Sequence, residues 1–290
     1  MTLAIGIAHA AWDPRRHASL RRLLDRLPPG VHVQRSERPE GSWGYARRLW
    51  RWAEAQGVDS VCLLNDDVEV CDDFAEAVDV MVASVPDGEI LGLHAQGEQA
   101  RSLAERGVNW CRAYNLTGPG NVASSYTYGK LADWWDSTPD LQCVKNVNED
   151  NVASQWMWDQ QRPAWLPLPS PLKHDASVPS TIGYDAHEHR TTLCPWDRFP
   201  VDMTDPATWA LRGPAHLVPW IENPWFPAKT LDSLRRRRKF EPLLGTCWYC
   251  GTGDGHATSN VTNCRICVQC AHKILGAYLP APESARTVAT

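Results

Sequence analysis

The fold is decided by residues 31–70, which read VHVQRSERPEGSWGYARRLWRWAEAQGVDSVCLLNDDVEV. The runs VHVQRS and SVCLL have the length and the β-branched, apolar composition of short strands. Between them, residues 43–56 carry apolar side chains at helical spacing, with Ser42 as a candidate N-cap and Gly57 as a stop signal. The stretch therefore predicts a strand, a helix and a second strand in succession.

The flanking sequence extends this alternation. Residues 2–8 have the pattern of a buried strand, and residues 14–27 place apolar side chains at helical spacing with arginines on the other face. Downstream, residues 72–85 predict a helix and residues 89–95 a strand. Alternating strands and helices are typical of a parallel sheet covered by helices. We therefore expect an α/β fold with a mostly parallel sheet and helices on both faces.

The sequence after this core is less regular. Glycine, asparagine and aromatic residues in 108–148 suggest loops around a site, and residues 150–160 predict a helix. The segment PAWLPLPSPLKHD at 163–175 is interrupted by prolines. From 195 to 227, proline and tryptophan recur without a clear period, so we expect irregular chain wrapping over the core.

Composition limits the class of protein. The 290 residues are 43% hydrophobic and 22% charged, which is close to globular averages, but 15 Trp against 4 Phe is unusual. Indole rings either build a core or line a groove that stacks flat ligands. A net charge of -5 argues against a surface that coats nucleic acid as a whole. No targeting signal or membrane-length apolar run is present in the sequence, so we expect a cytoplasmic protein that does not bind membranes.

Acidic residues follow the third predicted strand directly. Asn65, Asp66 and Asp67 stand at its carboxyl end, where open α/β sheets bind ligands. Two adjacent carboxylates repel each other, and a divalent cation such as Mg²⁺ or Mn²⁺ that bridges a diphosphate would relieve the repulsion. The alternative is an acidic turn that caps the next helix, for which Asp72 and Asp73 are better placed.

This stretch resembles the DXD-type motif of GT-A glycosyltransferases, in which the last carboxylate holds the metal that binds a nucleotide sugar. Asp67 takes that position here, and Asn65 departs from the usual first Asp. Residues 42–74 as a whole look like the corresponding segment of small glycosyltransferases from phages and actinobacteria. The resemblance implies a GT-A-like fold, a nucleotide-sugar donor such as a UDP-sugar, and donor contacts from Asn65, Asp66 and Asp67.

Two later segments continue the resemblance in the expected order. NEDNVASQWMWDQQ at 148–161 is similar to the element whose second acid usually serves as base in inverting members, which implies Asp150, with Glu149 beside it. PLPSPLKHDASVPSTIGYDAHEHR at 167–190 is similar to a segment whose His often returns to the metal, here His174. The alternative for Glu149 and Asp150 is an acid pair that only caps a helix, and the alternative for His174 is a purely structural histidine.

Two arginines are further candidates for phosphate binding. Arg47 lies on the predicted helix 43–56 and could reach a phosphate or simply solvate the helix. Arg190 closes the loop sequence DAHEHR and could clamp a diphosphate. In the same loop, the spacing of His187 and His189 is weak support for a metal site.

The most specific motif lies near the C-terminal end of the sequence. CWYC and CVQC, separated by sixteen residues, form two Cys-X-X-Cys pairs with the spacing of a four-thiolate zinc site: Cys247, Cys250, Cys267 and Cys270. Cys264 forms a competing pair with Cys267. A segment this short has too little core to fold alone, so Zn²⁺ would supply its folding energy. The module resembles zinc-ribbon or GATA-like modules.

A basic run precedes the cysteine module. Arg235, Arg236, Arg237, Arg238 and Lys239 stand just before two stackable rings, Trp248 and Tyr249. This pattern favours local nucleic-acid binding, although a charge run is usually a solvated face. We predict a glycosyltransferase domain at 1–230, a basic linker at 231–245 and a zinc module at 246–290.

The predicted activity is sugar transfer from a nucleotide sugar to an acceptor hydroxyl. Because the resembling proteins are commonly phage-encoded, a hydroxymethylated pyrimidine in DNA is the first acceptor to test. One alternative is a zinc-dependent binding protein with an inactive α/β domain. Another is a nucleotidyltransferase or nuclease that uses Asp66 and Asp67, for which no third carboxylate can be placed.

Overall fold

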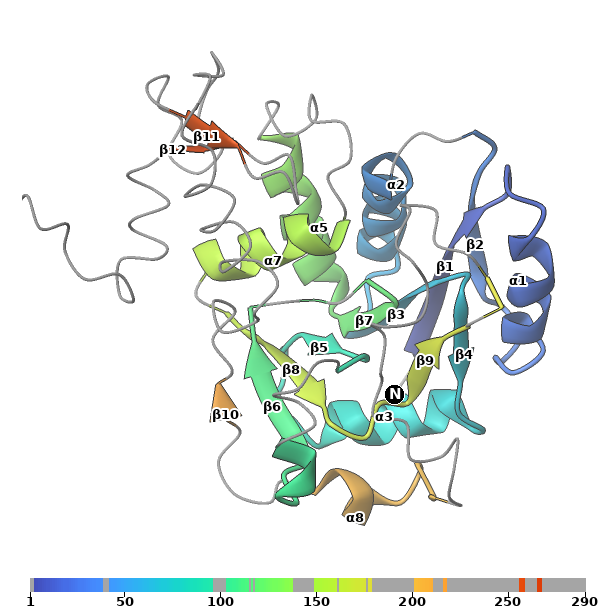
Figure 1. Cartoon of the computed structure of the whole chain (residues 1–290), viewed down its shortest axis with the longest axis vertical. Helices are drawn as coiled ribbons and strands as arrows, with labels where there is room; N and C mark the ends of the chain where they lie inside the picture. The colour runs from blue at the N-terminus through green and yellow to red at the C-terminus, as the bar shows by residue number, and fades with distance from the viewer. Residues whose placement is uncertain are drawn as a thin grey trace, which may run out of the picture. The chain divides into compact units, whose positions relative to one another are not determined.

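The structure is a computed structural model, and Figure 1 shows its ribbon. It describes residues 3–38, 42–95, 103–114, 116, 118–137, 149–160, 162–175, 177–178, 201–210, 216–217, 256–258 and 265–267. The chain divides into two compact units, Met1–Ser137 with Asn148–Trp220, and Thr138–Val147 with Ile221–Thr290. The predicted boundaries at 230 and 245 lie outside the described residues.

Three parallel strands form the N-terminal part of the sheet, as the sequence predicts. β1 (Leu3–Ala10) pairs on one side with β2 (His32–Ser36) and on the other with β3 (Ser60–Asn65). Their crossovers are the helices α1 (Arg16–Leu24) and α2 (Ser42–Ala55). α2 is followed by Gly57, whose φ of 64° allows the turn into β3. The deciding stretch therefore folds as its periodicity predicts.

The rest of the sheet contains both parallel and antiparallel pairs, so the sheet is mostly parallel, as expected, but mixed. Beyond β3 lie β7 (Gly120–Ala123), β5 (Leu91–Gly92), β8 (Ala164–Pro167), β6 (Trp110–Ala113) and β10 (His216–Leu217). β7 runs antiparallel to both β3 and β5, and β6 runs antiparallel to β8. The order across the sheet is β10-β6-β8-β5-β7-β3-β1-β2. The larger unit is therefore an α/β domain with a mixed sheet.

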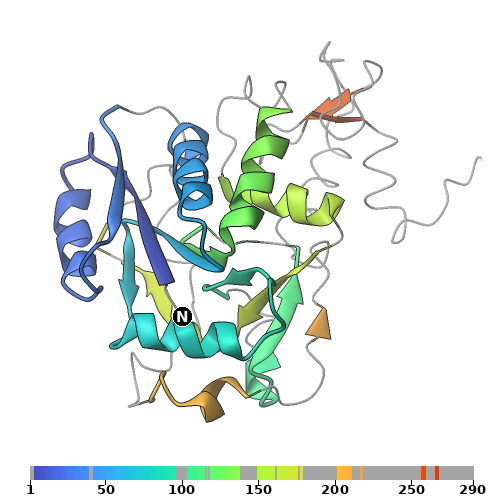
Figure 2. The ribbon, with the colours of Figure 1, turned by 180° about the vertical axis from the view of Figure 1, so that it is seen from behind.

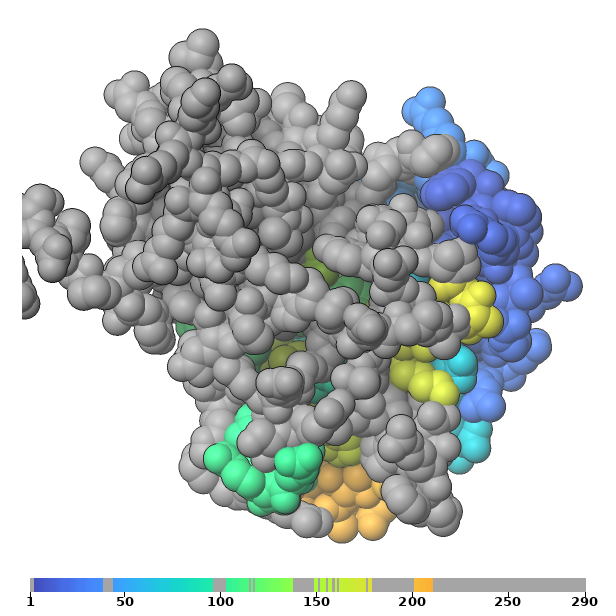
Figure 3. Space-filling view, viewed as in Figure 1, coloured from blue at the N-terminus to red at the C-terminus, as the bar shows by residue number. Residues whose placement is uncertain are grey.

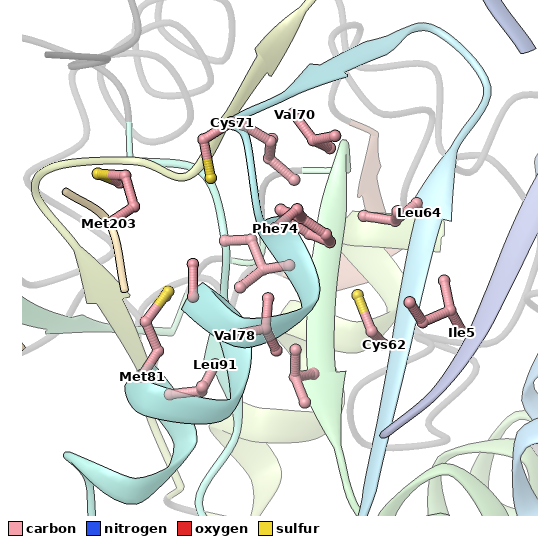
Figure 4. Packing of buried hydrophobic residues seen from close by; sticks show 14 of the residues in the cluster. Ile5, Cys62, Leu64, Val70, Cys71, Phe74, Val78, Met81, Leu91 and Met203 are labelled. Atoms are coloured by element: carbon pink, nitrogen blue, oxygen red, sulfur yellow. The ribbon is translucent and has the colours of Figure 1, made fainter. Parts of the chain in front are cut away.

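The first face of the sheet packs against α3 (Phe74–Ala83) and α8 (Pro206–Trp209). α3 lies across the sheet with α8 beside it in both ribbon views (Figures 1 and 2). Phe74, Val78 and Met81 of α3 point toward the strand residues in the close-up view (Figure 4). This face forms the main hydrophobic core.

The second face packs against α2, α5 (Ser125–Asp136) and α7 (Glu149–Asp159), which contact one another. Alternation along β1 sends Ile5 and Ile7 into the core beneath α3, while Gly6 faces α2. A Cβ at Gly6 would lie 2.5 Å from the ring of Trp52, so glycine allows the close approach of α2. Helices therefore cover both faces, as expected.

Most tryptophans of the larger unit whose side chains the structure describes are buried in the core. Trp110, Trp135 and Trp209 are among its largest fully buried side chains. Trp110 packs edge-on to Trp165, and its Nε1 donates to the carbonyl of Trp209 at 2.7 Å. Trp209 and Met203 belong to the main core, so residues 201–210 are an integral part of it rather than an irregular cover.

The prediction of loops in 108–148 is wrong for much of the segment. It contains β6, β7 and the twelve-residue helix α5. Ser124 caps α5, because its side chain accepts a hydrogen bond from the amide of Thr127 at 3.1 Å. At Gly129 a Cβ would lie 2.6 Å from Glu54 Oε1, so α5 packs closely on α2 through a residue that is itself a poor helix former.

A second, two-stranded sheet lies beyond the end of β3. β4 (Val68–Val70) pairs antiparallel with β9 (Leu172–His174), and Val68 is opposite His174. α1 contacts β4, and the surfaces of these segments adjoin in the space-filling view (Figure 3). This small sheet brings the proline-interrupted segment back to the acidic residues.

Within the described ranges, no helix combines the length and the apolar character needed to cross a membrane.

Candidate functional site

The site is built around the carboxyl end of β3, from segments that are far apart in the sequence. The amide of Asp175, just after β9, donates to the carbonyl of Asp67 at 2.8 Å. This contact and the Val68–His174 pairing place His174 Nδ1 3.9 Å from Asp67 Oδ2. The two residues that the sequence predicts as metal ligands are therefore neighbours.

Asp66 is held on both carboxylate oxygens by its own fold. It is 1% exposed, and its Oδ2 accepts from His9 Nδ1 at 2.7 Å and from the amide of Ala10 at 3.0 Å. Its Oδ1 accepts from the guanidinium of Arg16. Asp66 therefore fixes the ends of β1 and α1 against β3, and its contacts leave Asp67 as the carboxylate that turns to the site.

Arg16 joins the two acids. Its side chain is 7% exposed, and its second terminal nitrogen donates to Asp67 Oδ2 at 3.1 Å. Burial lowers the pKa of Arg16, but the negative charges of Asp67 and Asp66 outweigh it and raise that pKa overall. The charge repulsion that led us to expect a cation is thus relieved in part by an arginine.

Asp67 keeps one oxygen uncommitted. It is 6% exposed, and its Oδ1 is buried without a hydrogen-bond partner among the described residues. A buried carboxylate oxygen in this state costs free energy unless a cation or a donor group reaches it. The imidazole of His174 lies near the other oxygen of the same carboxylate, so an oxygen ligand and a nitrogen ligand are neighbours at the strand end.

Asp175 fastens β9 to α1. It is buried and accepts from Ser19 Oγ at 2.8 Å, from Arg22, and from the amide and hydroxyl of Ser177 at 2.9 and 2.6 Å. Burial raises the pKa of Asp175, but the hydrogen bonds from Ser177, Arg22 and Ser19 lower it to about 2 overall. The carboxylate is therefore a fixed anchor for the strand that carries His174.

The predicted acid pair at the start of α7 also reaches the strand end. Asn65 Nδ2 donates to the carbonyl of Gly118 at 2.8 Å and lies 3.5 Å from Glu149 Oε1. A Cβ at Gly118 would lie 3.4 Å from Glu149 Oε1 and 3.8 Å from Asp150 Oδ2. The glycine therefore leaves a small space that is bordered by Asn65, Glu149 and Asp150.

Tyr45 of α2 lies close enough to both acid groups to be affected by their charges, and no sequence pattern pointed to it. Burial, followed by the negative charges of Glu149 and Asp67, raises the pKa of its hydroxyl well above the ordinary value. His9 and Arg16 were missed as well. Only their positions, just after the first predicted strand, hint that they lie at the same edge of the sheet as the acids.

A cavity of about 30 Å³ opens beside the α7 acids. Glu149, Asp150 and Gly118 line it together with apolar side chains of α2, α5 and α7, among them Trp50 and Trp156. Its apolar wall lowers the local dielectric around the carboxylates and strengthens their interactions. Trp50 and Trp156 are themselves buried in the core, so at this point the tryptophans fit the predicted core rather than a ligand-stacking groove.

The other predicted site residues either make different contacts or fall outside the described ranges. Arg47 pairs with Asp136 on α5, and Arg51 extends this network to Asp133. Arg190 and the basic run 235–239 lie outside the described residues, as do Cys247, Cys250 and Cys270. In the smaller unit, β11 (His256–Thr258) pairs antiparallel with β12 (Arg265–Cys267), which ends at one of the predicted zinc ligands.

The described residues contain no ready-made cage for a metal. Among them, no group of three or more His, Cys, Asp or Glu side chains is placed to hold an ion. A Mg²⁺ or Mn²⁺ site that is completed by substrate phosphates needs only one or two protein ligands. Asp67 and His174 fit that second kind of site.

Comparison with known proteins identifies no family. No family model matches the sequence, and no curated protein matches it. Among solved structures, A197 from STIV is similar with a TM-score of 0.36 and 9% identity, over 60% of this chain and 84% of that one. Mannose-1-phosphate geranyltransferase from Thermus thermophilus is similar with a TM-score of 0.36 and 13% identity, over 61% and 77%. These values are too low for either protein's activity to be transferred to this chain.

Proposed function

We propose that this protein is a metal-dependent glycosyltransferase that moves a sugar from a nucleotide sugar, with a UDP-sugar as first choice, to an acceptor hydroxyl. One observation carries the proposal: the carboxyl end of β3 gathers Asp67, His174 and the acid pair of α7 at one place. The resemblance of the sequence to GT-A enzymes assigns donor binding and acceptor activation to these same residues.

Asp67 and His174 form the donor side. The uncommitted Oδ1 of Asp67 and the nearby imidazole would hold a divalent cation together with the donor's diphosphate. When bound, the cation supplies positive charge that stabilises the departing phosphate. Asp175 keeps His174 at this place through the β9 anchor. Asn65 lies between the donor side and the acceptor side and would orient the sugar or the ribose.

Asp150 and Glu149 form the acceptor side. Both stand in the first turn of α7, where the helix dipole favours the ionised carboxylate. An ionised Asp150 would accept the proton of the attacking hydroxyl, with Glu149 and Asn65 orienting it. The apolar wall of the neighbouring cavity would limit the access of water to this side, which would favour transfer over hydrolysis of the donor.

The geometry favours this function over a nuclease that uses Asp66 and Asp67 together. Two-metal catalysis needs carboxylates that are free to bridge ions. Both oxygens of Asp66 accept hydrogen bonds from β1 and α1 instead. Asp66 is therefore better assigned to positioning the strand end, and Asp67 to the ion.

The test is a screen of nucleotide sugars for release of the nucleoside diphosphate, with Mn²⁺, Mg²⁺ or EDTA, and with or without hydroxymethylated DNA. We expect cation-dependent release from one donor, and loss of it in Asp67→Asn. Asp72→Asn is the matched control, since Asp72 is exposed and pairs only with Arg26 among the described residues. Donor binding that is equally tight in EDTA would overturn the role of Asp67.

The C-terminal segment is proposed to hold one structural Zn²⁺ through Cys247, Cys250, Cys267 and Cys270. The support is the spacing of the two Cys-X-X-Cys pairs and the β11–β12 hairpin that ends at Cys267. Elemental analysis of protein purified without chelator should find about one equivalent, and Cys267→Ser should lose it. Less than half an equivalent in the wild-type chain would refute the site.

The basic run is proposed to bind the DNA acceptor. Replacing Arg235, Arg236, Arg237 and Arg238 with Ala should raise the apparent KM for DNA and flatten its salt dependence by about 0.9 in log–log slope per lost phosphate contact. Turnover at saturating DNA should change little, because such contacts are the same in ground and transition states. Unchanged DNA affinity across a salt series would exclude this role.

A further inference from the structure

Arg16 occupies an unusual position for an arginine in a proposed cation site. Its guanidinium is buried and donates to Asp66 Oδ1 with one nitrogen and to Asp67 Oδ2 with the other. Arginine stays protonated under all ordinary conditions, and this planar fork fits two carboxylates better than lysine would. The acid pair therefore has a permanent positive partner built into α1.

The charge balance of the cluster follows from these contacts. Two carboxylates and one guanidinium leave a single net negative charge at the strand end. A divalent cation that approaches Asp67 is attracted by the acids and repelled by Arg16, which shares the same carboxylate. In a buried site these interactions are several times stronger than in water.

Asp66 holds Arg16 in this place. The same carboxylate also accepts from His9 and the Ala10 amide, so Asp66 cannot turn away without breaking buried hydrogen bonds. The positive charge is thus fixed beside Asp67.

From this geometry we infer that Arg16 is a positioning residue that makes cation binding at Asp67 conditional on the donor's diphosphate. The inference rests on the proposed function and deepens it. Alone, the cation meets one net negative charge and few ligands. The diphosphate adds both negative charge and oxygen ligands, so cation and donor bind together. Arg16 thereby prevents the cation from binding firmly without donor.

The test measures Mn²⁺ binding by the loss of the free-ion electron paramagnetic resonance signal, with and without UDP. In the wild-type chain, UDP should tighten Mn²⁺ binding at least about tenfold. Arg16→Gln should tighten binding of Mn²⁺ alone by about tenfold or more, because one positive charge is removed. Arg21→Gln is the matched control, because Arg21 is an exposed residue of the same helix whose side chain donates to the His17 carbonyl. It should leave Mn²⁺ binding unchanged.

A second variant covers the case in which Arg16→Gln does not fold. Asp66→Asn keeps an oxygen that can accept from the Ala10 amide, and Arg16 can still donate to Asp67. The net charge of residues 16, 66 and 67 then changes from one negative charge to zero. Mn²⁺ binding in the presence of UDP should weaken about tenfold.

The outcomes distinguish a failure of the role of Arg16 from a failure of the cation site. Tight Mn²⁺ binding to the wild-type chain without UDP, or Mn²⁺ affinities in the folded variants equal to wild type, would overturn the role of Arg16 and leave the proposed function standing. Absence of Mn²⁺ binding even with UDP, in wild type and variants alike, would overturn the cation site itself and the inference with it.

Discussion

The two acid pairs of the site are held in opposite ways. Asp66 and Asp67 are buried, and β1, α1 and the segment after β9 fix them through hydrogen bonds and ion pairs. Glu149 and Asp150 are half-buried at the mouth of a cavity, and the contact between Asn65 and Glu149 is long at 3.5 Å. The first pair is fixed by the framework, with Asp67 Oδ1 as its one buried oxygen without a partner among the described residues, while the second pair lines the cavity. The difference predicts which substitutions damage the fold and which damage the chemistry.

The largest effect should come from Asp66→Ala. It removes the acceptor for His9, for the Ala10 amide and for one nitrogen of Arg16, so we expect a loss of about 3–5 kcal/mol in the free energy of unfolding. Urea unfolding followed by circular dichroism measures it. Asp72→Ala, at an exposed acid, should change stability by less than about 0.5 kcal/mol. Equal stabilities of the two variants would show that the first pair is not part of the framework.

Asp150→Asn should lower activity strongly and stability only slightly, in contrast to Asp66→Ala. A half-buried acid at a helix start contributes little to stability, but losing a general base should lower kcat about 10²–10⁴-fold. Donor affinity should stay near the wild-type value, because the proposed donor contacts lie at Asp67 and His174. The measurement is steady-state transfer together with calorimetric donor binding. A variant that keeps wild-type kcat would exclude Asp150 as the base.

Asp175→Asn tests the anchor that holds β9. The buried carboxylate accepts hydrogen bonds from Ser19, Arg22 and Ser177. Its replacement should therefore lower the free energy of unfolding by about 1–3 kcal/mol. It should also weaken Mn²⁺ binding with UDP, because His174 is the residue before it.

A matched control for this variant is Asp202→Asn. Asp202 accepts from the amide and hydroxyl of Thr204 in the same local pattern, but in an exposed turn. Asp202→Asn should lower the free energy of unfolding by less than about 0.5 kcal/mol and leave Mn²⁺ binding unchanged. Similar effects of the two substitutions would mean that Asp175 acts only within its own turn.

The smallest effect on stability should come from Gly118→Ala. The new Cβ would lie 3.4 Å or more from its neighbours, which is ordinary contact, but it fills the space between Asn65, Glu149 and Asp150. We expect a change in stability below about 1 kcal/mol and a loss of transfer of about tenfold or more. Full activity in this variant would show that no substrate group enters this space.

Gly120→Ala, two residues further on at the start of β7, supplies the contrast. Its Cβ would lie 2.7 Å from a methyl of Leu172 and 2.8 Å from one of Leu64, so overpacking should cost about 1–3 kcal/mol. Thermal melts of the two alanine variants therefore distinguish a site glycine from a packing glycine.

Sequence patterns predicted the framework well where a segment shows one clear period. The three N-terminal strands and their helices, α3 and α7 follow from it. α5 was missed, because its mid-helix Gly129 and Ser-Tyr-Thr start weaken the helical signal, and the close packing on α2 that stabilises it cannot be seen in one segment alone. The antiparallel β7 was also missed, since strand direction depends on long-range pairing.

The site shows the same limit at the level of single residues. Asp67, His174, Glu149 and Asp150 carry a recognisable pattern, and the structure brings them together. Arg16 carries no such pattern, because helical spacing groups it with the exposed arginines of α1. Its burial is explained only by its contacts with Asp66 and Asp67, which follow β3. Whether a charged residue is buried depends on partners that lie elsewhere in the chain.

The tie between α1 and the segment after β9 also has a consequence for folding. Ser19 and Asp175 are 156 residues apart in sequence, so their contact closes most of the larger unit into a loop. Such closure carries a large entropic cost and slows the step that forms it. During synthesis, the N-terminal strands and helices can pair before residues 172–175 have left the ribosome. We therefore expect His174 to join Asp67 late, and a nascent chain that stops short of β9 should fold its first strands without acquiring the proposed cation site.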